Sequence, residues 1–111
     1  MPTQVFKILG QSNPSINTNT TLYTVPAGNS AVISSISVCN ANVSTNHNFS
    51  IAVVKSGEVL SAKHYIAQNN VVGFLDTVMI TCGLTLSNGD SLNVFTTGAN
   101  TSFGAFGSEI Y

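Results

Sequence analysis

The stretch that decides the fold is Ala31-Val32-Ile33-Ser34-Ser35-Ile36-Ser37-Val38-Cys39. Apolar and small polar side chains alternate along it, so that one face carries Val32, Ile36 and Val38 and the other carries Ser35 and Ser37. A period of two is typical of a β-strand with one face buried and the other toward solvent. We therefore predict a strand over residues 31–39 and a layered β-structure that covers its apolar face.

Further runs of β-branched and aromatic residues recur through the chain, separated by Gly, Pro, Asn and Ser. They are Val5–Leu9, Thr20–Val25, Phe49–Val54, Val59–Ala67, Val71–Leu86, Ser91–Thr96 and Ser102–Ile110. We expect Asn69-Asn70 to end a run, and residues 71–86 to form either two strands or one strand bent near Gly83. The sequence Ser87-Asn88-Gly89-Asp90 predicts a hairpin that joins Thr81–Leu86 with Ser91–Thr96 and is tightened by Asp90, because Asn-Gly tolerates positive φ.

These strand signals predict an all-β protein. Seven to nine short strands without a significant helix fit an antiparallel β-sandwich, of the jelly-roll or the immunoglobulin-like type. A parallel sheet is disfavoured, because it would need a crossover helix. We divide the chain into residues 1–19, an N-terminal strand or arm that could reach an adjacent subunit, and residues 20–111, the sandwich domain.

Charge is almost missing from the chain. Three lysines, no arginine and four acidic residues give a net charge of −1, and charged residues make up 6% of the sequence, against about 25% in an ordinary soluble domain. In their place stand 14 Ser, 12 Thr and 13 Asn. Because charge repulsion contributes little to keeping copies apart, we expect a homo-oligomer or a part of a larger assembly.

The same composition excludes several partners. Lys7, Lys55 and Lys63 are too few and too scattered for nucleic acid, whose binding depends on several Lys or Arg contacts to phosphate. No stretch approaches the roughly 18 consecutive apolar residues of a membrane helix, so no membrane partner is expected. The first residues show no basic region followed by an apolar one, so we expect synthesis in a cytoplasm without a signal peptide.

We expect neither catalysis nor a cofactor nor a metal ion, because the GxSxG, GxxxxGK[ST] and HExxH patterns are all missing. His64 lies beside Lys63 and Tyr65 in the most site-like cluster, yet a satisfied strand histidine explains it better than a general base. Asp76 and Glu109 are expected at the surface, where they limit pairing between sheet edges.

The two cysteines, Cys39 and Cys82, lie 43 positions apart without CxxC spacing. Free buried thiols that act as small hydrophobes are the favoured interpretation. A disulfide between two strands stays open as the alternative.

Five segments together resemble small virion structural proteins of tailed bacteriophages, notably those that infect cyanobacteria and other aquatic bacteria. The segments are Thr21–Gly28, Ala31–Asn40, Ala62–Ala67, Gly83–Leu86 and Ser102–Ile110. Their motifs look like fold determinants, namely a Pro-Gly turn, core strands and a closing strand. The resemblance implies a non-enzymatic β-sandwich module carried on the virion, and it leaves head, neck, tail and fibre open as locations.

The function implied by this resemblance is that of a head decoration or cement protein, or of a neck or tail accessory protein, which packs as an oligomer against other virion proteins. The alternative is a tail-fibre or receptor-binding module that recognises host-surface glycans through the loop 40–48. His47 is expected to be exposed in that loop, and Gly104 and Gly107 could allow close approach by a neighbour. The candidate interaction residues are Asn42, His47, Tyr65, Phe103 and Phe106.

Overall fold

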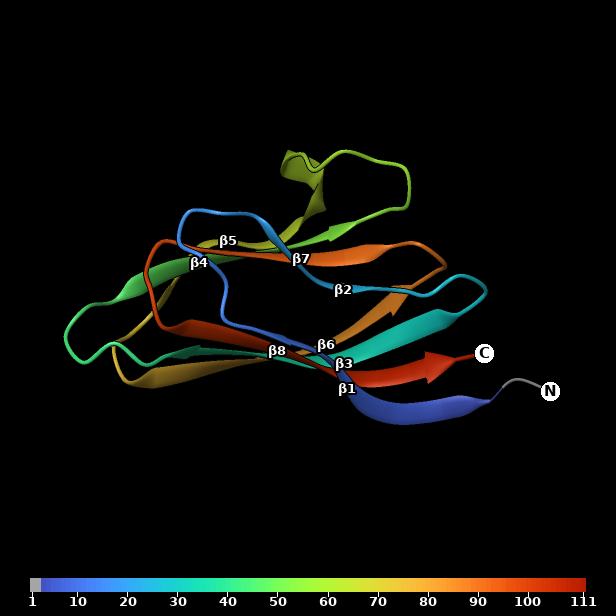
Figure 1. The fold of residues 1–111 in the computed structure, drawn as a ribbon, viewed down its shortest axis with the longest axis horizontal. Coiled ribbons are helices and arrows are strands. Elements are labelled where there is room, and N and C mark those ends of the chain that lie inside the picture. Colours follow the sequence, from blue (N-terminus) through green and yellow to red (C-terminus); the bar gives the residue numbers. More distant parts are fainter. Residues whose placement is uncertain (1–2) are drawn as a thin grey trace.

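The computed structural model describes residues 3–111, which form eight β-strands and one short 3₁₀ turn (Figure 1). The strands are β1 Gln4–Ser12, β2 Thr20–Thr24, β3 Ser30–Asn40, β4 His47–Val54, β5 Tyr65–Val72, β6 Asp76–Leu86, β7 Ser91–Thr96 and β8 Thr101–Ile110, and the 3₁₀ turn η1 is Ala62–His64. No α-helix occurs in this described part of the chain. The predicted all-β chain of seven to nine strands is confirmed.

Two four-stranded antiparallel sheets pack face to face as a sandwich (Figure 1). Sheet A has the order β1-β8-β3-β6, and sheet B has the order β2-β7-β4-β5. Only β4 and β5 are neighbours both along the chain and in a sheet, so every other connection crosses from one sheet to the other. This connectivity is a jelly roll, and it decides between the two sandwich types that the sequence leaves open.

The core lies between the sheets, where aliphatic side chains surround a pair of aromatic rings. Phe49 of β4 and Phe103 of β8 are both buried and meet edge to face, with ring centroids 6.4 Å apart and ring planes at 68°. The ring quadrupoles favour this arrangement. Because each sheet contributes one ring, the pair ties the two layers together.

The strand β3 changes the phase of its alternation at Ser34. Ile33 is fully buried before this residue, and Ile36 and Val38 are fully buried after it, because the pairing of β3 with both β6 and β8 skips Ser34. One extra residue in a strand moves the following side chains to the other face. Val32 therefore lies on the outer face, and its predicted place beside Ile36 and Val38 is wrong.

The strand β5 begins later and runs further than predicted. Residues 59–61 form no strand, η1 follows, and β5 starts at Tyr65 and continues to Val72. Asn69 and Asn70 lie inside it, where Asn69 has a φ of 54° and the pairing with β4 shifts in register. Asparagine tolerates this left-handed conformation, so the strand bulges at the predicted break instead of ending there.

The break between the two strands of residues 71–86 falls at the turn 73–75. The amide of Asp76 donates to the carbonyl of Gly73 at 3.2 Å, which closes this turn, and β6 then runs without interruption to Leu86. The two-strand alternative is therefore right. Gly83 lies where the pairing of β6 with β3 shifts in register.

The turn 87–90 connects the two sheets and does not form a hairpin. Gly89 has a φ of 83°, and the amide of Asp90 donates to the carbonyl of Ser87 at 3.0 Å. The Asp90 carboxylate accepts from the amides of Ser87 and Ser56, each at 2.9 Å, so Asp90 tightens the turn as expected. However, β6 belongs to sheet A and β7 to sheet B; a local turn signal does not say in which sheet the next strand lies.

The N-terminal segment enters the sandwich. Residues 4–12 form β1, which pairs antiparallel with β8 as one edge of sheet A, with Gln4 opposite Ile110. Met1 and Pro2 of the expected arm lie outside the described residues. The contact of this segment with an adjacent subunit stays a prediction.

Candidate interaction surface

The outer faces of the two sheets differ in what covers them. On sheet B, Ala52 and Val54 are buried although they do not belong to the core between the sheets. The excursion of residues 55–64, which connects β4 with β5, lies on this side of the molecule (Figure 1), and its η1 turn contacts β4. Sheet B is thus partly covered by its own chain and exposes Ile66 and Val71 on β5, whereas the outer face of sheet A, which the chain leaves uncovered, exposes Phe6, Ile8 and Met79.

His64 holds the excursion together. Its Nδ1 accepts from the amide of Ser61 at 2.9 Å, so its Nε2 carries the proton and donates to Glu58 at 2.8 Å. Lys63 adds an ion pair with the same Glu58 oxygen at 3.1 Å. The hydrogen bonds from His64 and then from Lys63 lower the pKa of Glu58. His64 is buried and has its hydrogen bonds satisfied, but it lies in the 3₁₀ turn and not in the predicted strand.

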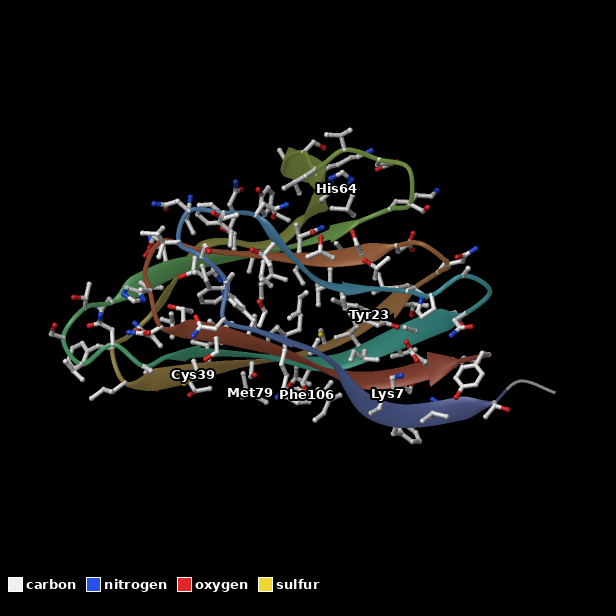
Figure 2. All side chains as sticks on the ribbon, viewed as in Figure 1. Lys7, Tyr23, Cys39, His64, Met79 and Phe106 are labelled. Carbon is white, nitrogen blue, oxygen red and sulfur yellow. The ribbon has the colours of Figure 1, made fainter. Side chains whose placement is uncertain are left out.

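We name the outer face of sheet A the open face. Register and alternation place neutral side chains on it, namely Gln4, Phe6, Ile8 and Gln11 of β1, Ser102, Gly104, Phe106, Ser108 and Ile110 of β8, Ser30, Val32, Ser35, Ser37 and Cys39 of β3, and Thr77, Met79, Thr81 and Thr85 of β6. Cys39, Met79 and Phe106 are seen together on this side in Figure 2. Phe6 is 78% exposed, Met79 58% and Ile8 56%. A neighbour that covered this face would bury no charge.

A shallow hollow of about 410 Å³ lies at one end of the open face. It is lined by Gln11, Ser12, Asn13, Ser37, Cys39, Ser102, Phe103 and Gly104. Gly104 keeps this part of the hollow open, since a Cβ at this position would lie 2.9 Å from both Phe106 Cζ and Ser37 Oγ and would displace these side chains. The lining offers amides, hydroxyls and a thiol without any charged group, which suits a neutral polar ligand.

Three polar side chains form a clasp between the sheets. Glu109 of β8 accepts a hydrogen bond from the Tyr23 hydroxyl of β2 at 2.6 Å and pairs with Lys7 of β1 at 2.7 Å (Lys7 and Tyr23 are labelled in Figure 2). Lys7 and then Tyr23 lower the pKa of Glu109, while burial and then the Glu109 bond raise the pKa of Tyr23. Glu109 is 4% exposed, so its predicted surface position is wrong.

A missed signal could have located this clasp. Alternation places Glu109 on the inward side, between Ser108 and Ile110 on the open face, and Lys7 has the same phase in β1. A carboxylate at an inward position of a strand requires a partner of opposite charge. Because the chain has few positive charges, Lys7, which has the same phase in β1, was a candidate for the partner of Glu109.

His47 and Asn42 lie close along the chain but differ in environment. His47 is the first residue of β4 and is buried at 5% exposure, with Nδ1 2.8 Å from the hydroxyl of Thr101. Its expected exposure in the loop is wrong, because the strand begins earlier than predicted. Asn42 shapes that loop, since its side-chain oxygen accepts from the amides of Ser44 and Thr45, each at 2.9 Å.

The three predicted aromatic residues do not form one site. Tyr65 is half-buried at the start of β5, in sheet B. Phe103 and Phe106 lie in β8 of sheet A but on opposite faces, since Phe103 is buried in the core and Phe106 is half-buried on the open face beside Gly104. Of the five candidates, Phe103 is the one that lines the hollow, and Phe106 lies beside Gly104 of that lining.

Both cysteines are free. Cys39 lines the hollow on the open face, whereas Cys82 packs against the core from the other face of the same sheet. Burial raises the pKa of the Cys82 thiol. Among residues 3–111, no group of three or more His, Cys, Asp or Glu side chains could hold a metal ion. None of the helical segments in that range has the length and apolar character needed to cross a membrane.

The eight-stranded jelly roll defines the structural class of this chain, and solved structures are similar to it in fold. The chain is similar in fold to chains of the T13 viral particle of infectious bursal disease virus, with a TM-score of 0.60 at 13% identity over 98% of this chain and 30% of that chain. The VP2 subviral particle of that virus gives a TM-score of 0.55 at 16% identity, over 98% and 32% of the two chains. The chain thus spans about a third of the length of these neighbours.

At this level of identity the likeness establishes the fold. No protein-family model matches the sequence, and a search of curated proteins finds no match to it.

Proposed function

We propose that this chain is a non-enzymatic structural subunit of a virus particle, which is held in place by neighbours that cover its open face. The observation that carries the proposal is the contrast between the two sheets: sheet B is partly covered by the chain's own excursion, while sheet A presents a large face of neutral side chains with exposed Phe6, Ile8 and Met79. Covering such a face costs little desolvation energy, because no unpaired charge is buried. The shared fold with chains of a virus particle supports the same role.

In its finer form, the proposal is that the chain is a component of a tailed-phage virion. It would be a head decoration or cement protein, or an accessory protein of the neck or tail. The resemblance of the five sequence segments supports this form, whereas the neighbours in fold come from an animal virus. The partners would be further copies of this chain and other virion proteins.

The direct test is the copy number of this chain in purified particles of the virus that encodes it, measured by quantitative mass spectrometry against the major capsid protein. Hundreds of copies per particle would support a role on the head lattice, and a few to a few dozen copies would support the neck, tail or fibre. If purified particles hold none, the virion proposal fails.

The open face provides a sharper test of the mode of attachment. Phe6→Ser with Ile8→Ser removes two exposed apolar side chains of β1 and leaves the backbone pairing with β8 in place, so the sandwich should stay folded while incorporation into particles falls. Val43→Ser with Val59→Ser is a matched control, because these two loop side chains are also exposed, at 74% and 87%. Equal incorporation of both double variants would exclude the Phe6 and Ile8 side chains of the open face as a contact.

A second candidate function is the binding of a host-surface glycan. The observation that favours it is the neutral hollow, whose amides and hydroxyls suit the hydroxyls of a sugar and whose lining includes Phe103. Ser102→Phe would fill the hollow from an exposed position, and Thr85→Phe on the same sheet is the control. Glycan-array binding that Ser102→Phe abolishes and Thr85→Phe retains would support a receptor-binding module over a cement protein.

A further inference from the structure

We propose that β6 pairs with β6 of a second copy, in antiparallel orientation about a two-fold axis at Met79, so that two four-stranded sheets join into one sheet of eight strands. This contact goes beyond the proposed virion role and does not depend on it, because it would form between purified chains.

The strand β6 is an edge of sheet A, bonded to β3 on one side only. An edge strand presents unpaired backbone donors and acceptors, and proteins usually protect it with charges, Pro or bulges. Between Thr77 and Thr81 this edge carries none of these, since the pairing with β3 is continuous from Cys39–Thr77 to Ser35–Thr81. The segment is therefore free to accept another strand.

The other edges are less suitable. β1 carries Lys7 and shifts register between Ile8 and Gly10. β2 has five residues and shifts between Thr21 and Tyr23, and β5 shifts twice against β4. The straight, uncharged part of β6 is the edge where an added strand meets the fewest obstacles.

The sequence of this edge is symmetric in character about Met79. It reads Thr77-Val78-Met79-Ile80-Thr81, so antiparallel pairing with a second copy places Thr77 opposite Thr81, Val78 opposite Ile80 and Met79 opposite Met79. A two-fold contact requires such self-complementarity, because each residue meets its mirror position in the partner. β-Branched side chains that face each other across a strand pair stabilise a sheet.

The two sides of the joined strands also match. Val78 and Ile80 are half-buried and pack against the core, so the pairing would continue each core into the other and complete the burial of these side chains. Thr77, Met79 and Thr81 face outward, which would continue the open face across the axis. Asp76 would lie opposite Cys82, so the two carboxylates of the dimer stand at opposite ends of the contact and do not repel each other.

The register can be tested by crosslinking the full chain in a Cys39→Ser, Cys82→Ala background. Directly opposed side chains have Cβ atoms about 4.5–5.5 Å apart, so Met79→Cys should form an intermolecular disulfide on mild oxidation. Thr77→Cys alone should not, but a mixture of Thr77→Cys and Thr81→Cys chains should give a crosslinked pair. Thr85→Cys, exposed on the same strand beyond the register shift, is the control.

The affinity can be tested by sedimentation of the native chain against Met79→Lys. Two lysines would then face each other at the axis, and we expect the dissociation constant to rise about tenfold or more, while Thr85→Lys leaves it unchanged. The proposal is overturned if the native chain is a monomer at hundreds of micromolar, if Met79→Cys crosslinks no faster than Thr85→Cys, or if Thr77→Cys crosslinks to itself as readily as to Thr81→Cys. None of these results would decide whether the chain is part of a virion.

Discussion

Tyr23 and Glu109 connect the two sheets through a single short hydrogen bond. The Tyr23 hydroxyl in β2 donates to the Glu109 carboxylate in β8 at 2.6 Å, across 86 positions of sequence. Since Lys7 of β1 pairs with the same carboxylate, three strands from both layers meet at one buried charge. In a chain with few charges, this clasp is the natural place to measure what polar contacts contribute to stability.

Tyr23→Phe should lower the free energy of unfolding by about 1–3 kcal/mol, because it leaves a largely buried carboxylate without one of its donors. The measurement is urea denaturation followed by circular dichroism. Tyr65→Phe, at the start of β5 in sheet B, is the matched control and should stay close to the native value. A Tyr23→Phe chain as stable as the native one would show that the bond contributes nothing net.

Stability should fall in acid through Glu109. Its pKa in the folded chain lies below the ordinary value of 4.5, chiefly because of Lys7 and then Tyr23. A carboxyl group whose pKa is lower in the folded than in the unfolded state stabilises the folded state at pH values above the ordinary pKa. This contribution is lost as the pH falls through the folded pKa. We expect the difference in melting temperature between the native chain and Glu109→Gln to be largest above pH 5 and to shrink below pH 4.

The pKa of Glu58 is also lowered, but Glu58 is present in both proteins and its effect cancels in the difference. A gap between the two melting temperatures that stays constant from pH 7 to pH 2 would contradict the predicted role of the Glu109 charge.

Gly107→Ala should be strongly destabilising, whereas Gly83→Ala should be nearly neutral. A Cβ at Gly107 would collide with the backbone of Val32 and Ile33 in β3, which cannot move aside, whereas a Cβ at Gly83 would have no heavy atom within 4 Å. Overpacking of this kind costs about 1–3 kcal/mol. The two variants are compared by their denaturant midpoints, and equal midpoints would contradict the close approach of β8 to β3.

Phe103→Ala should cost about 3–5 kcal/mol of stability, because it removes half of the aromatic pair that ties the sheets together. Phe6→Ala is the control, since this ring is 78% exposed and its loss should change stability little. Thermal unfolding measures both. An unchanged melting temperature of Phe103→Ala would contradict the core position of this ring and favour its predicted place on an interaction surface.

The alternation of side chains predicted the strands well, and it failed where a strand slips by one residue. In β3 the pattern on either side of Ser34 is regular, but the bulge at Ser34 reverses which side is buried, so Val32 was placed on the wrong face. A bulge of one residue has no signature in the composition or the length of a strand-forming run, so a single sequence does not reveal it. The same holds for Asn69, where a bulge looks like a strand end.

The sheet that each successive strand joins is the second feature of the fold that local patterns do not predict. The Asn88-Gly89 turn was recognised with its hydrogen bond, yet whether β7 returns beside β6 or crosses to the other sheet depends on contacts distant in sequence. The candidate interaction residues show the same limit. Phe106 and Phe103 differ by three positions, and alternation placed them correctly on opposite faces. Which of the two faces is the core depends on the packing of sheet B, whose Phe49 meets Phe103.

The backbone amides of Thr3 and Tyr111 each donate to the other residue's carbonyl, so the described chain starts and finishes at the same end of a body about 50 Å long (Figure 1). A linker of a few residues could therefore join residues 3 and 111 into a ring, and the ring could be opened in the remote loop of residues 41–46. A peptide attached next to Thr3 or Tyr111 would emerge from that one end and leave the opposite end, with the loop of residues 41–46, unobstructed.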